Sequence, residues 1–216
     1  YGRFVSRFPT IRMLAQAPLH DVLQQWSGLG YNRRALALHN TAQIIVNDYC
    51  GRIPADNTLL LQLPGIGPAT AGAVLAFAYT QPVVFIETNI RRAYIHQFFA
   101  KKKMISDSCI LPLVRQTLDS RRPRRWYYAL MDYGAALGRT GNNPNRRSAH
   151  YIKQGQFSGS TRQLRGLVIR ILTIHKSLSY DRLVQLCENE VTRDEQVSDV
   201  ETVVDSLVEE HFMTRN

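Results

Sequence analysis

Cysteine and long apolar runs are scarce in this chain of 216 residues. The three cysteines, Cys50, Cys109 and Cys187, lie far apart, a spacing that fits neither a disulfide scaffold nor a metal site of closely spaced thiolates. We therefore expect a reducing compartment, either cytoplasmic (nucleoid-associated) or nuclear, with each thiol acting as a small buried hydrophobe. No stretch approaches the roughly 18 to 20 apolar residues of a membrane span, and no secretory signal opens the sequence. These absences argue against membrane proteins and secreted disulfide scaffolds.

Acidic residues are also rare, but only in the first 187 residues. That region holds 25 of the 27 Lys and Arg and 8 of the 17 acids, a balance of +17, whereas residues 188–216 hold 2 basic and 9 acidic residues, a balance of −7. A basic body favours a polyanionic partner, most commonly nucleic acid. The alternative is a high-pI protein without such a partner. The acidic end suits protein contact or packing against the basic body better than DNA reading.

Helical periodicity dominates the remaining pattern, and the 44% apolar content is enough for a real core. An extended connector is expected at 81–86, and residues 87–89 are placed to cap the helix that follows. A polar, glycine-rich stretch at 138–159 indicates a domain boundary, and the helices after it resemble a winged-helix or helix-turn-helix module. The expected helices are 18–26, 33–49, 58–63, 68–79, 90–99, 107–119, 123–138, 161–175, 179–189 and 198–211.

The sharpest local motif is Leu-Pro-Gly-Ile-Gly-Pro-Ala-Thr-Ala at 63–71. Its glycines allow a tight hairpin between two helices, and the amides that open the second helix, together with the helix dipole, can bind a phosphate oxygen. Such a contact positions a protein on DNA without reading its sequence. The alternative is an ordinary turn between core helices. The candidate phosphate-contacting residues of this motif are Gly65, Ile66, Gly67, Ala69 and Thr70.

Several motifs in one order give the chain a family resemblance over about residues 1–150. It resembles the endonuclease III and MutY branch of the helix-hairpin-helix (HhH-GPD) DNA glycosylases, and the adenine-mismatch (MutY) members most. The resemblance implies an all-α fold of two helical lobes, followed here by the winged-helix-like module, with domains at 1–155 and 160–216. The matching segments are 7–10, 17–19, 26–31, 63–71, 87–92 and 129–134.

The resemblance implies a catalytic carboxylate at Glu87, about twenty residues after the hairpin, in a cleft between the lobes. The family usually has Asp there, and Glu87 is the only Glu in the first 187 residues. When a flipped nucleotide loses its base, the sugar develops oxocarbenium character, which a fixed carboxylate stabilises. The extra methylene moves the carboxylate by about an ångström, a shift that can cost roughly a hundredfold in rate. The alternative is a Glu that caps a helix or is solvated.

The resemblance also indicates which activity to exclude. Bifunctional members carry a Lys two residues after the second hairpin glycine, where this chain has Ala69. Because alanine has no amine, we expect no Schiff base at that position and no lyase activity through it. The expected enzyme is a monofunctional DNA glycosylase.

Further DNA-contact candidates come from an aromatic and several basic positions. Tyr31 matches a wedge position whose ring can enter the base stack, although a core tyrosine is the alternative. Arg33 and Arg34 open a helix, and each either contacts phosphate or lies on a solvated face. Asn89 and Arg91 follow Glu87 and are the remaining candidates. Arg91, like Arg92 beside it, either contacts phosphate or lies on a solvated face. The cluster of arginines at 121–126 suggests contact with the DNA phosphate backbone, and the alternative is a charge run without a partner.

The sequence departs from the family in three places. Residues 137–160 contain no cysteine, where the family usually has four cluster ligands, so we expect no iron–sulfur cluster, no metal and no other cofactor. MutY-type enzymes have an earlier helix, with a second catalytic Glu, upstream of the position of Tyr1. Because the first residue is Tyr1 rather than Met, we expect the chain to be a fragment or a trimmed product. The C-terminal domain of MutY is not recognisable in residues 160–216.

The resulting interpretation is hydrolysis of the N-glycosidic bond of a flipped, mismatched or damaged base in base-excision repair. The nearest precedent is adenine opposite an oxidised guanine. The expected partner is double-stranded DNA with a lesion or mismatch, with no membrane partner and a monomeric state. A catalytically weak or inactive DNA-binding module of the same fold is the first alternative. A regulator that reads DNA through its C-terminal helices is the second, which the acidity of 188–216 disfavours.

Overall fold

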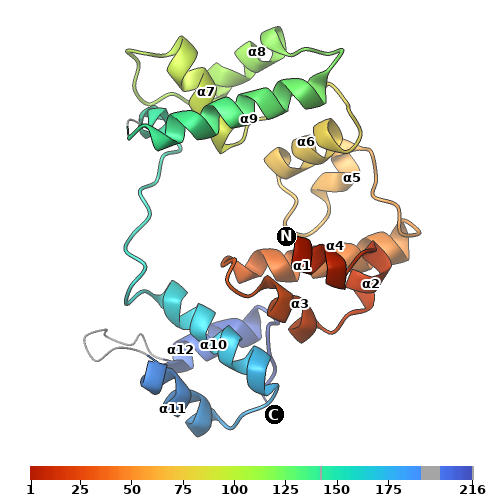
Figure 1. Ribbon diagram of the computed structural model, residues 1–216, viewed down its shortest axis with the longest axis vertical. Coiled ribbons are helices and arrows are strands. Elements are labelled where there is room, and N and C mark those ends of the chain that lie inside the picture. The colour runs from red at the N-terminus through yellow and green to blue at the C-terminus, as the bar shows by residue number, and fades with distance from the viewer. Residues whose placement is uncertain (142, 191–199, 216) are drawn as a thin grey trace. The chain divides into compact units, whose positions relative to one another are not determined.

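The computed structural model describes residues 1–141, 143–190 and 200–215, and helices dominate these residues (Figure 1). They contain no β-strand, only one isolated parallel bridge between Ile105 and Ser148, which confirms the all-α fold class. None of their helices has the length and apolarity to cross a bilayer. The elements are α1 (Gly2–Arg7), α2 (Ile11–Gln16), α3 (Leu19–Trp26), α4 (Asn32–Asp48), α5 (Asn57–Leu61), α6 (Pro68–Phe77), α7 (Thr88–Phe98), α8 (Asp107–Thr117), α9 (Pro123–Arg139), the 3₁₀ helix η1 (Pro144–Arg147), α10 (Thr161–His175), α11 (Tyr180–Glu190) and α12 (Val200–Glu209).

The helices from α3 to α12 lie where periodicity predicts them, within a few residues at each end. The connector at 81–86 belongs to no helix or strand, as expected, and its Val83 carbonyl accepts a hydrogen bond from the Tyr127 hydroxyl at 2.7 Å. Helices α1, α2 and η1 were not predicted, because they are short and have few buried residues. The first two residues of the helix expected at 198–211 lie outside the described residues.

Contacts divide the chain into two compact units. The first, called the terminal unit, combines Tyr1–Ile53 with Gln154–Asn216. Its largest core joins Leu23 of α3 and Ala35 of α4 to apolar side chains of α10, α11 and α12. Helix α10 packs on α3, and also on α11 and α12. The C-terminal helices therefore share a core with the N-terminal ones.

The second unit, called the central unit, spans Pro54–Lys153. Its core is built around Phe85, Ile90, Ile110 and the fully buried Tyr127. Helix α7 packs on α9, α8 and η1, while α6 packs on α5 and α9. This core anchors the connector and the start of α7, where Glu87 stands.

The unit boundaries differ from the expected division into 1–155 and 160–216, because the contacts place the first 53 residues with the C-terminal helices. The assignment of 1–155 as one functional domain stays a prediction. The winged-helix likeness also stays a prediction, since the segment 191–199 between α11 and α12 lies outside the described residues.

Candidate active site and DNA-contact surfaces

Glu87 is the N-cap residue of α7, so the capping alternative describes its local structure correctly. Its Oε1 accepts hydrogen bonds from the amides of Asn89 at 2.6 Å and Ile90 at 2.7 Å. In the described structure, Oε2 receives one long bond of 3.4 Å from Asn89 Nδ2. The side chain is half-buried. Oε1 is thus fixed by the amides at the start of α7, and the helix dipole favours negative charge there. Oε2 can still accept a hydrogen bond from a ligand or interact with its charge.

The start of α7 is held in place by contacts to α9 and η1. Arg92 Nη1 donates to Asn89 Oδ1 at 2.8 Å and to the carbonyl of Gly134 at 2.7 Å, and its Nε donates to Asn143 Oδ1 at 3.0 Å. From η1, Asn145 Nδ2 donates to the carbonyl of Thr88 at 2.9 Å. These bonds rigidify the backbone that carries Glu87, as an electrostatically acting carboxylate requires.

The connector that leads to Glu87 is fixed by close packing against α6. Phe85 and Ile86 are buried. A Cβ on Gly72 would lie only 2.4 Å from the Cβ of Phe85, so glycine is needed there for the connector to approach.

Arg91, a DNA-contact candidate, forms an ion pair within the central unit. Its Nε and Nη2 donate to the two carboxylate oxygens of Asp107 at 2.7 and 2.6 Å, and this hydrogen bonding holds the pKa of Asp107 below its ordinary value. This ion pair is neither the phosphate contact nor the solvated face that the sequence suggests for Arg91. A DNA contact by Arg91 stays a prediction. Such a contact requires Arg91 either to bind phosphate while it keeps its ion pair with Asp107 or to exchange Asp107 for the phosphate.

The hairpin at 63–71 has the geometry that the motif predicts. Gly65 has a φ of 71°, and Gly67 is the extended N-cap of α6, followed by Pro68 at the first helical position. No side chain caps α6. The first amide of the helix that donates a hydrogen bond to a preceding carbonyl is that of Ala71, which donates to Gly67 at 2.9 Å. In the described structure the amides of Ala69 and Thr70 are therefore open to a ligand, while Ile66 is half-buried.

Tyr31 lies in the terminal unit, on a loop that is fixed but exposed. Trp26 Nε1 donates to the carbonyl of Gly30 at 2.9 Å, and Gly28, Gly30 and Tyr31 all have positive φ. Tyr31 is 67% exposed, and its hydroxyl accepts a hydrogen bond from Gln154 Nε2 at 3.1 Å. The core-tyrosine alternative is therefore wrong, and an aromatic wedge remains the interpretation.

Arg33 and Arg34 follow in the first turn of α4, and both are exposed. Arg33 forms a two-pronged ion pair with Glu210, with Nε and Nη2 each 2.7 Å from a carboxylate oxygen. Three partners were not predicted from the sequence: Glu210 for Arg33, Gln154 for Tyr31 and Asp107 for Arg91. No local signal in the sequence could have found them, since these pairs are 177, 123 and 16 positions apart.

The cysteine prediction holds for one thiol of three. Cys187 is buried, which raises its pKa to about 11. Cys50 and Cys109 are exposed, so the expectation that each thiol is a buried hydrophobe is wrong for them. Cys50 lies in the turn after α4, and Cys109 in the first turn of α8.

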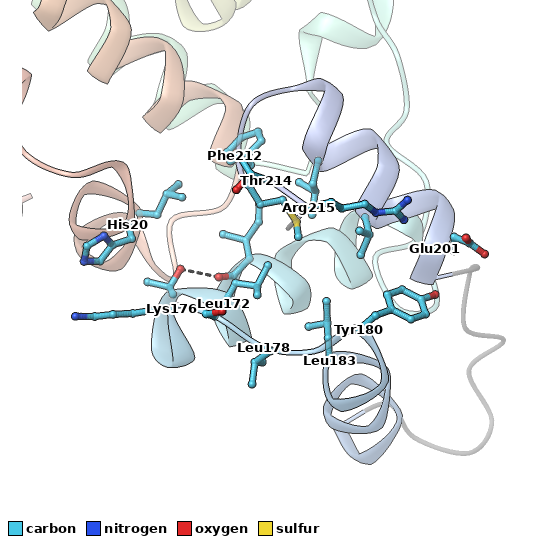
Figure 2. A pocket seen from close by; sticks show the side chains of 17 residues that line it. His20, Leu172, Lys176, Leu178, Tyr180, Leu183, Glu201, Phe212, Thr214 and Arg215 are labelled. Atoms are coloured by element: carbon cyan, nitrogen blue, oxygen red, sulfur yellow. Dashed lines mark hydrogen bonds between the residues drawn. The ribbon is translucent and has the colours of Figure 1, made fainter.

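A pocket of 560 Å³ lies within the terminal unit, between α3, α10, α11, α12 and the residues that follow α12 (Figure 2). Leu172, Leu183 and Phe212 contribute apolar walls, with the charged Lys176 and Glu201 among the lining residues. No candidate site residue is among the described residues that line it. The pocket is therefore not formed by the predicted DNA contacts.

Comparisons with known proteins identify the fold and the family of the chain. The fold is that of a DNA glycosylase, since a thermostable thymine-DNA glycosylase structure matches 67% of this chain and 68% of its own, at 21% identity and a TM-score of 0.56. The model of the HhH-GPD superfamily of base excision DNA repair proteins matches residues 1–109. The chain belongs to this superfamily.

Within the superfamily, the chain is similar to curated adenine DNA glycosylases. The chain is 35% identical over 141 residues to an adenine DNA glycosylase of Buchnera aphidicola subsp. Baizongia pistaciae, a match that covers 63% of this chain and 39% of the relative. It is 33% identical over 190 residues to an adenine DNA glycosylase of Mycolicibacterium smegmatis, covering 80% of this chain and 64% of the relative. The chain thus spans less than two thirds of the length of these relatives.

An iron–sulfur cluster, which the resemblance implies for most members, does not fit the residues present. Such a cluster needs four thiolates, but the chain has three cysteines, two exposed on α8 and the turn after α4 and one buried in α11. Within the described ranges no three His, Cys, Asp or Glu side chains gather into a metal site.

Proposed function

We propose that this protein is a monofunctional DNA glycosylase of base-excision repair. It hydrolyses the N-glycosidic bond of a flipped, mismatched or damaged base in double-stranded DNA. The observation that carries the proposal is the Glu87 carboxylate, with one oxygen fixed by two amides at the start of α7 and the other held by a single long bond. Membership of the superfamily and the names of the curated relatives support it.

Glu87 acts on charge that develops at the sugar. As the bond between the sugar and the base breaks, the electron pair leaves with the base and the sugar becomes oxocarbenium-like. A carboxylate that is already fixed stabilises this charge without reorganising, and its second oxygen can orient the water that completes hydrolysis. The products are a free base and an intact strand with an abasic site.

Lyase activity is not part of the proposal. Ala69 has no side-chain amine, and it lies in the first turn of α6, where its own amide has no hydrogen-bond partner in the described structure. Its role is to leave the backbone N–H accessible to a phosphate oxygen. Strand cleavage would need an amine from elsewhere in the protein.

The proposed partner is lesion-bearing duplex DNA bound by a monomer, with adenine as the first base to test because both curated relatives are adenine DNA glycosylases. The hairpin amides supply contacts that do not depend on sequence. Tyr31, with its exposed ring, would hold open the gap beside the flipped nucleotide. We further propose that no iron–sulfur cluster takes part.

A DNA-binding module without activity is the second candidate. The observation that favours it is that the family's Asp is replaced by Glu87, whose longer side chain here folds back to cap its own helix. A carboxylate displaced by about an ångström loses much of its effect on rate. Such a protein would still hold DNA through the hairpin and the basic surface.

A panel of labelled duplexes, each with one lesion or mismatch and including adenine opposite 8-oxoguanine, distinguishes the two. The full natural chain should produce abasic sites that become strand breaks only after alkali. Borohydride should trap no covalent complex. Binding to the whole panel without excision of any base would overturn the enzymatic proposal in favour of the binding module.

A further inference from the structure

Arg33 of α4 and Glu210, directly after α12, form the longest-range ion pair that involves a DNA-contact candidate in the described residues. The guanidinium meets the carboxylate edge to edge through Nε and Nη2, both at 2.7 Å. Arg33 is two residues from the exposed ring of Tyr31, whereas Glu210 lies 177 positions further on. The end of α12 therefore reaches the proposed wedge loop.

Glu210 has other partners that hold it in place. Arg165 of α10 donates to Oε2 at 2.8 Å, and Ser206 of α12 donates to Oε1 at 3.0 Å. The side chains of Arg165 and Glu210 are only 18% and 21% exposed, but Arg33 is 74% exposed. Arg165, Ser206 and Glu210 thus form a rigid base, on which Arg33 is the outward-facing member.

The core beneath supports the same arrangement. Leu23 of α3 and Ala35 of α4 lie in one apolar cluster with α10, α11 and α12. Gln154, at the start of the C-terminal segment, donates to the Tyr31 hydroxyl. The two predicted DNA contacts here, Tyr31 and Arg33, are therefore both held by residues from the C-terminal part of the chain.

We propose that Glu210 is a positioning residue that orders the Arg33 guanidinium for a DNA phosphate beside the Tyr31 wedge. The inference rests on the DNA binding in the proposed function. An arginine has five N–H donors, and the bonds to Glu210 use one on Nε and one on Nη2, which leaves three for phosphate. The group of Arg33, Arg165 and Glu210 keeps a net charge of +1, so it still attracts an anion. Ordering a flexible arginine before binding lowers the entropy cost of the complex.

Competition is the opposite possibility, since Glu210 could occupy Arg33 and keep phosphate away. The two possibilities predict opposite signs. If Glu210 positions Arg33, its neutralisation weakens DNA binding, although it removes a negative charge near a polyanion. If Glu210 competes with phosphate, the same change tightens binding.

The test measures the affinity of the full chain for a duplex with a tetrahydrofuran abasic-site analogue, by fluorescence anisotropy at fixed salt. This duplex has no base to excise, so the result does not depend on glycosylase activity. The variants are Glu210→Gln, Arg33→Ala and the double variant. Asp205→Asn is the matched control, since it removes a charge from α12 at an exposed ion pair with Arg215.

We expect Glu210→Gln to weaken DNA binding about fivefold. Asp205→Asn should leave the affinity unchanged or slightly raise it. In the Arg33→Ala background, Glu210→Gln should have no further effect on the affinity. Arg33→Lys, which keeps the charge but cannot make the two-pronged contact, should weaken binding as Glu210→Gln does. It also tests the proposal if Glu210→Gln fails to fold.

Tighter or unchanged binding by both Glu210→Gln and Arg33→Lys would overturn the inference. Equal weakening by Glu210→Gln with and without Arg33 would also overturn it, because that result indicates a loosened α12. If the wild-type chain does not bind the duplex even at low salt, the proposed function fails, and the inference fails with it.

Discussion

Gly134 of α9 faces the backbone carbonyl of Asn89 on α7 so closely that a Cβ on Gly134 would lie 2.1 Å from that oxygen. Backbone cannot move aside as the end of a flexible side chain can. The contact brings α9 against the first turn of α7, where Glu87 is the cap. The absence of a side chain at position 134 thus helps to position the candidate catalytic carboxylate.

Gly134→Ala should therefore destabilise the protein by about 1–3 kcal/mol, the usual cost of overpacking. Gly166→Ala in α10 is the matched control, because its Cβ would meet nothing within 4 Å. It should stabilise by up to about 1 kcal/mol through helix propensity. Urea unfolding of both variants measures the difference, and equal free energies of unfolding would contradict the close contact.

Much of the fold could be predicted from the sequence because its signals are local. Apolar spacing gave the helices from α3 to α12, and the motif at 63–71 gave the hairpin with Gly65 at positive φ and Gly67 at the N-cap. Residues 87–89 were expected to cap α7, and of these Glu87 is the N-cap, whereas Thr88 and Asn89 are already in the helix. Such signals depend on neighbours within a few positions.

The unpredicted features depend on distant partners. Arg33 pairs with Glu210, and Tyr31 with Gln154, through contacts that only the folded chain creates. The acidity of 188–216 favours protein contact or packing against the basic body, but it does not indicate a particular partner residue. The sharing of one core by α3, α4 and the C-terminal helices was also not visible, because amphipathic periodicity shows that a face is buried but not against what.

The hairpin interpretation predicts that Gly67→Asp weakens binding to every duplex alike. Gly67 has N-cap geometry, and a Cβ at this position would meet nothing within 4 Å, so an Asp can cap the amides of Ala69 and Thr70 and repel phosphate. We expect at least about tenfold weaker binding, from loss of hydrogen bonds to a charged group. Protein stability should be retained or slightly raised.

Gly67→Ala is the control for this variant, since it leaves the amides uncapped, and its affinity should stay within about twofold of the wild type. Anisotropy titrations on lesion-bearing and undamaged duplexes measure the effect. Unaltered affinity in Gly67→Asp would remove the hairpin from the DNA interface.

Acid should weaken the contribution of Glu210 to stability. Hydrogen bonding by Arg33, with further bonds from Arg165 and Ser206, lowers the pKa of Glu210 from 4.5 to about 2. A lowered folded-state pKa gives stability that is fully present above pH 4.5 and is lost as the pH falls toward 2. The difference in free energy of unfolding between wild type and Glu210→Gln should therefore shrink over this range. Urea titrations from neutral pH down into this acid range measure it, and a constant difference would disagree with the prediction.

Purified protein should be colourless and free of iron. The reason is the missing set of four thiolates, since residues 137–160 contain no cysteine and the three cysteines lie on separate elements. Iron analysis and visible absorbance of anaerobically purified protein provide the check. Stoichiometric iron with a broad visible absorbance band would show that other ligands hold a cluster.

Base excision by Glu87→Gln, compared with wild type and Glu87→Asp, tests the central claim most directly. The Gln side-chain oxygen can still accept from the amides of Asn89 and Ile90, so the start of α7 should stay intact while the negative charge is lost. Loss of that charge should slow excision by about 10²–10³-fold with DNA affinity nearly unchanged, and Glu87→Asp, which restores the residue usual in the family, should retain activity. Single-turnover rates on the best duplex of the panel, read after alkali, give the result. A Glu87→Gln rate equal to that of the wild type would contradict the account.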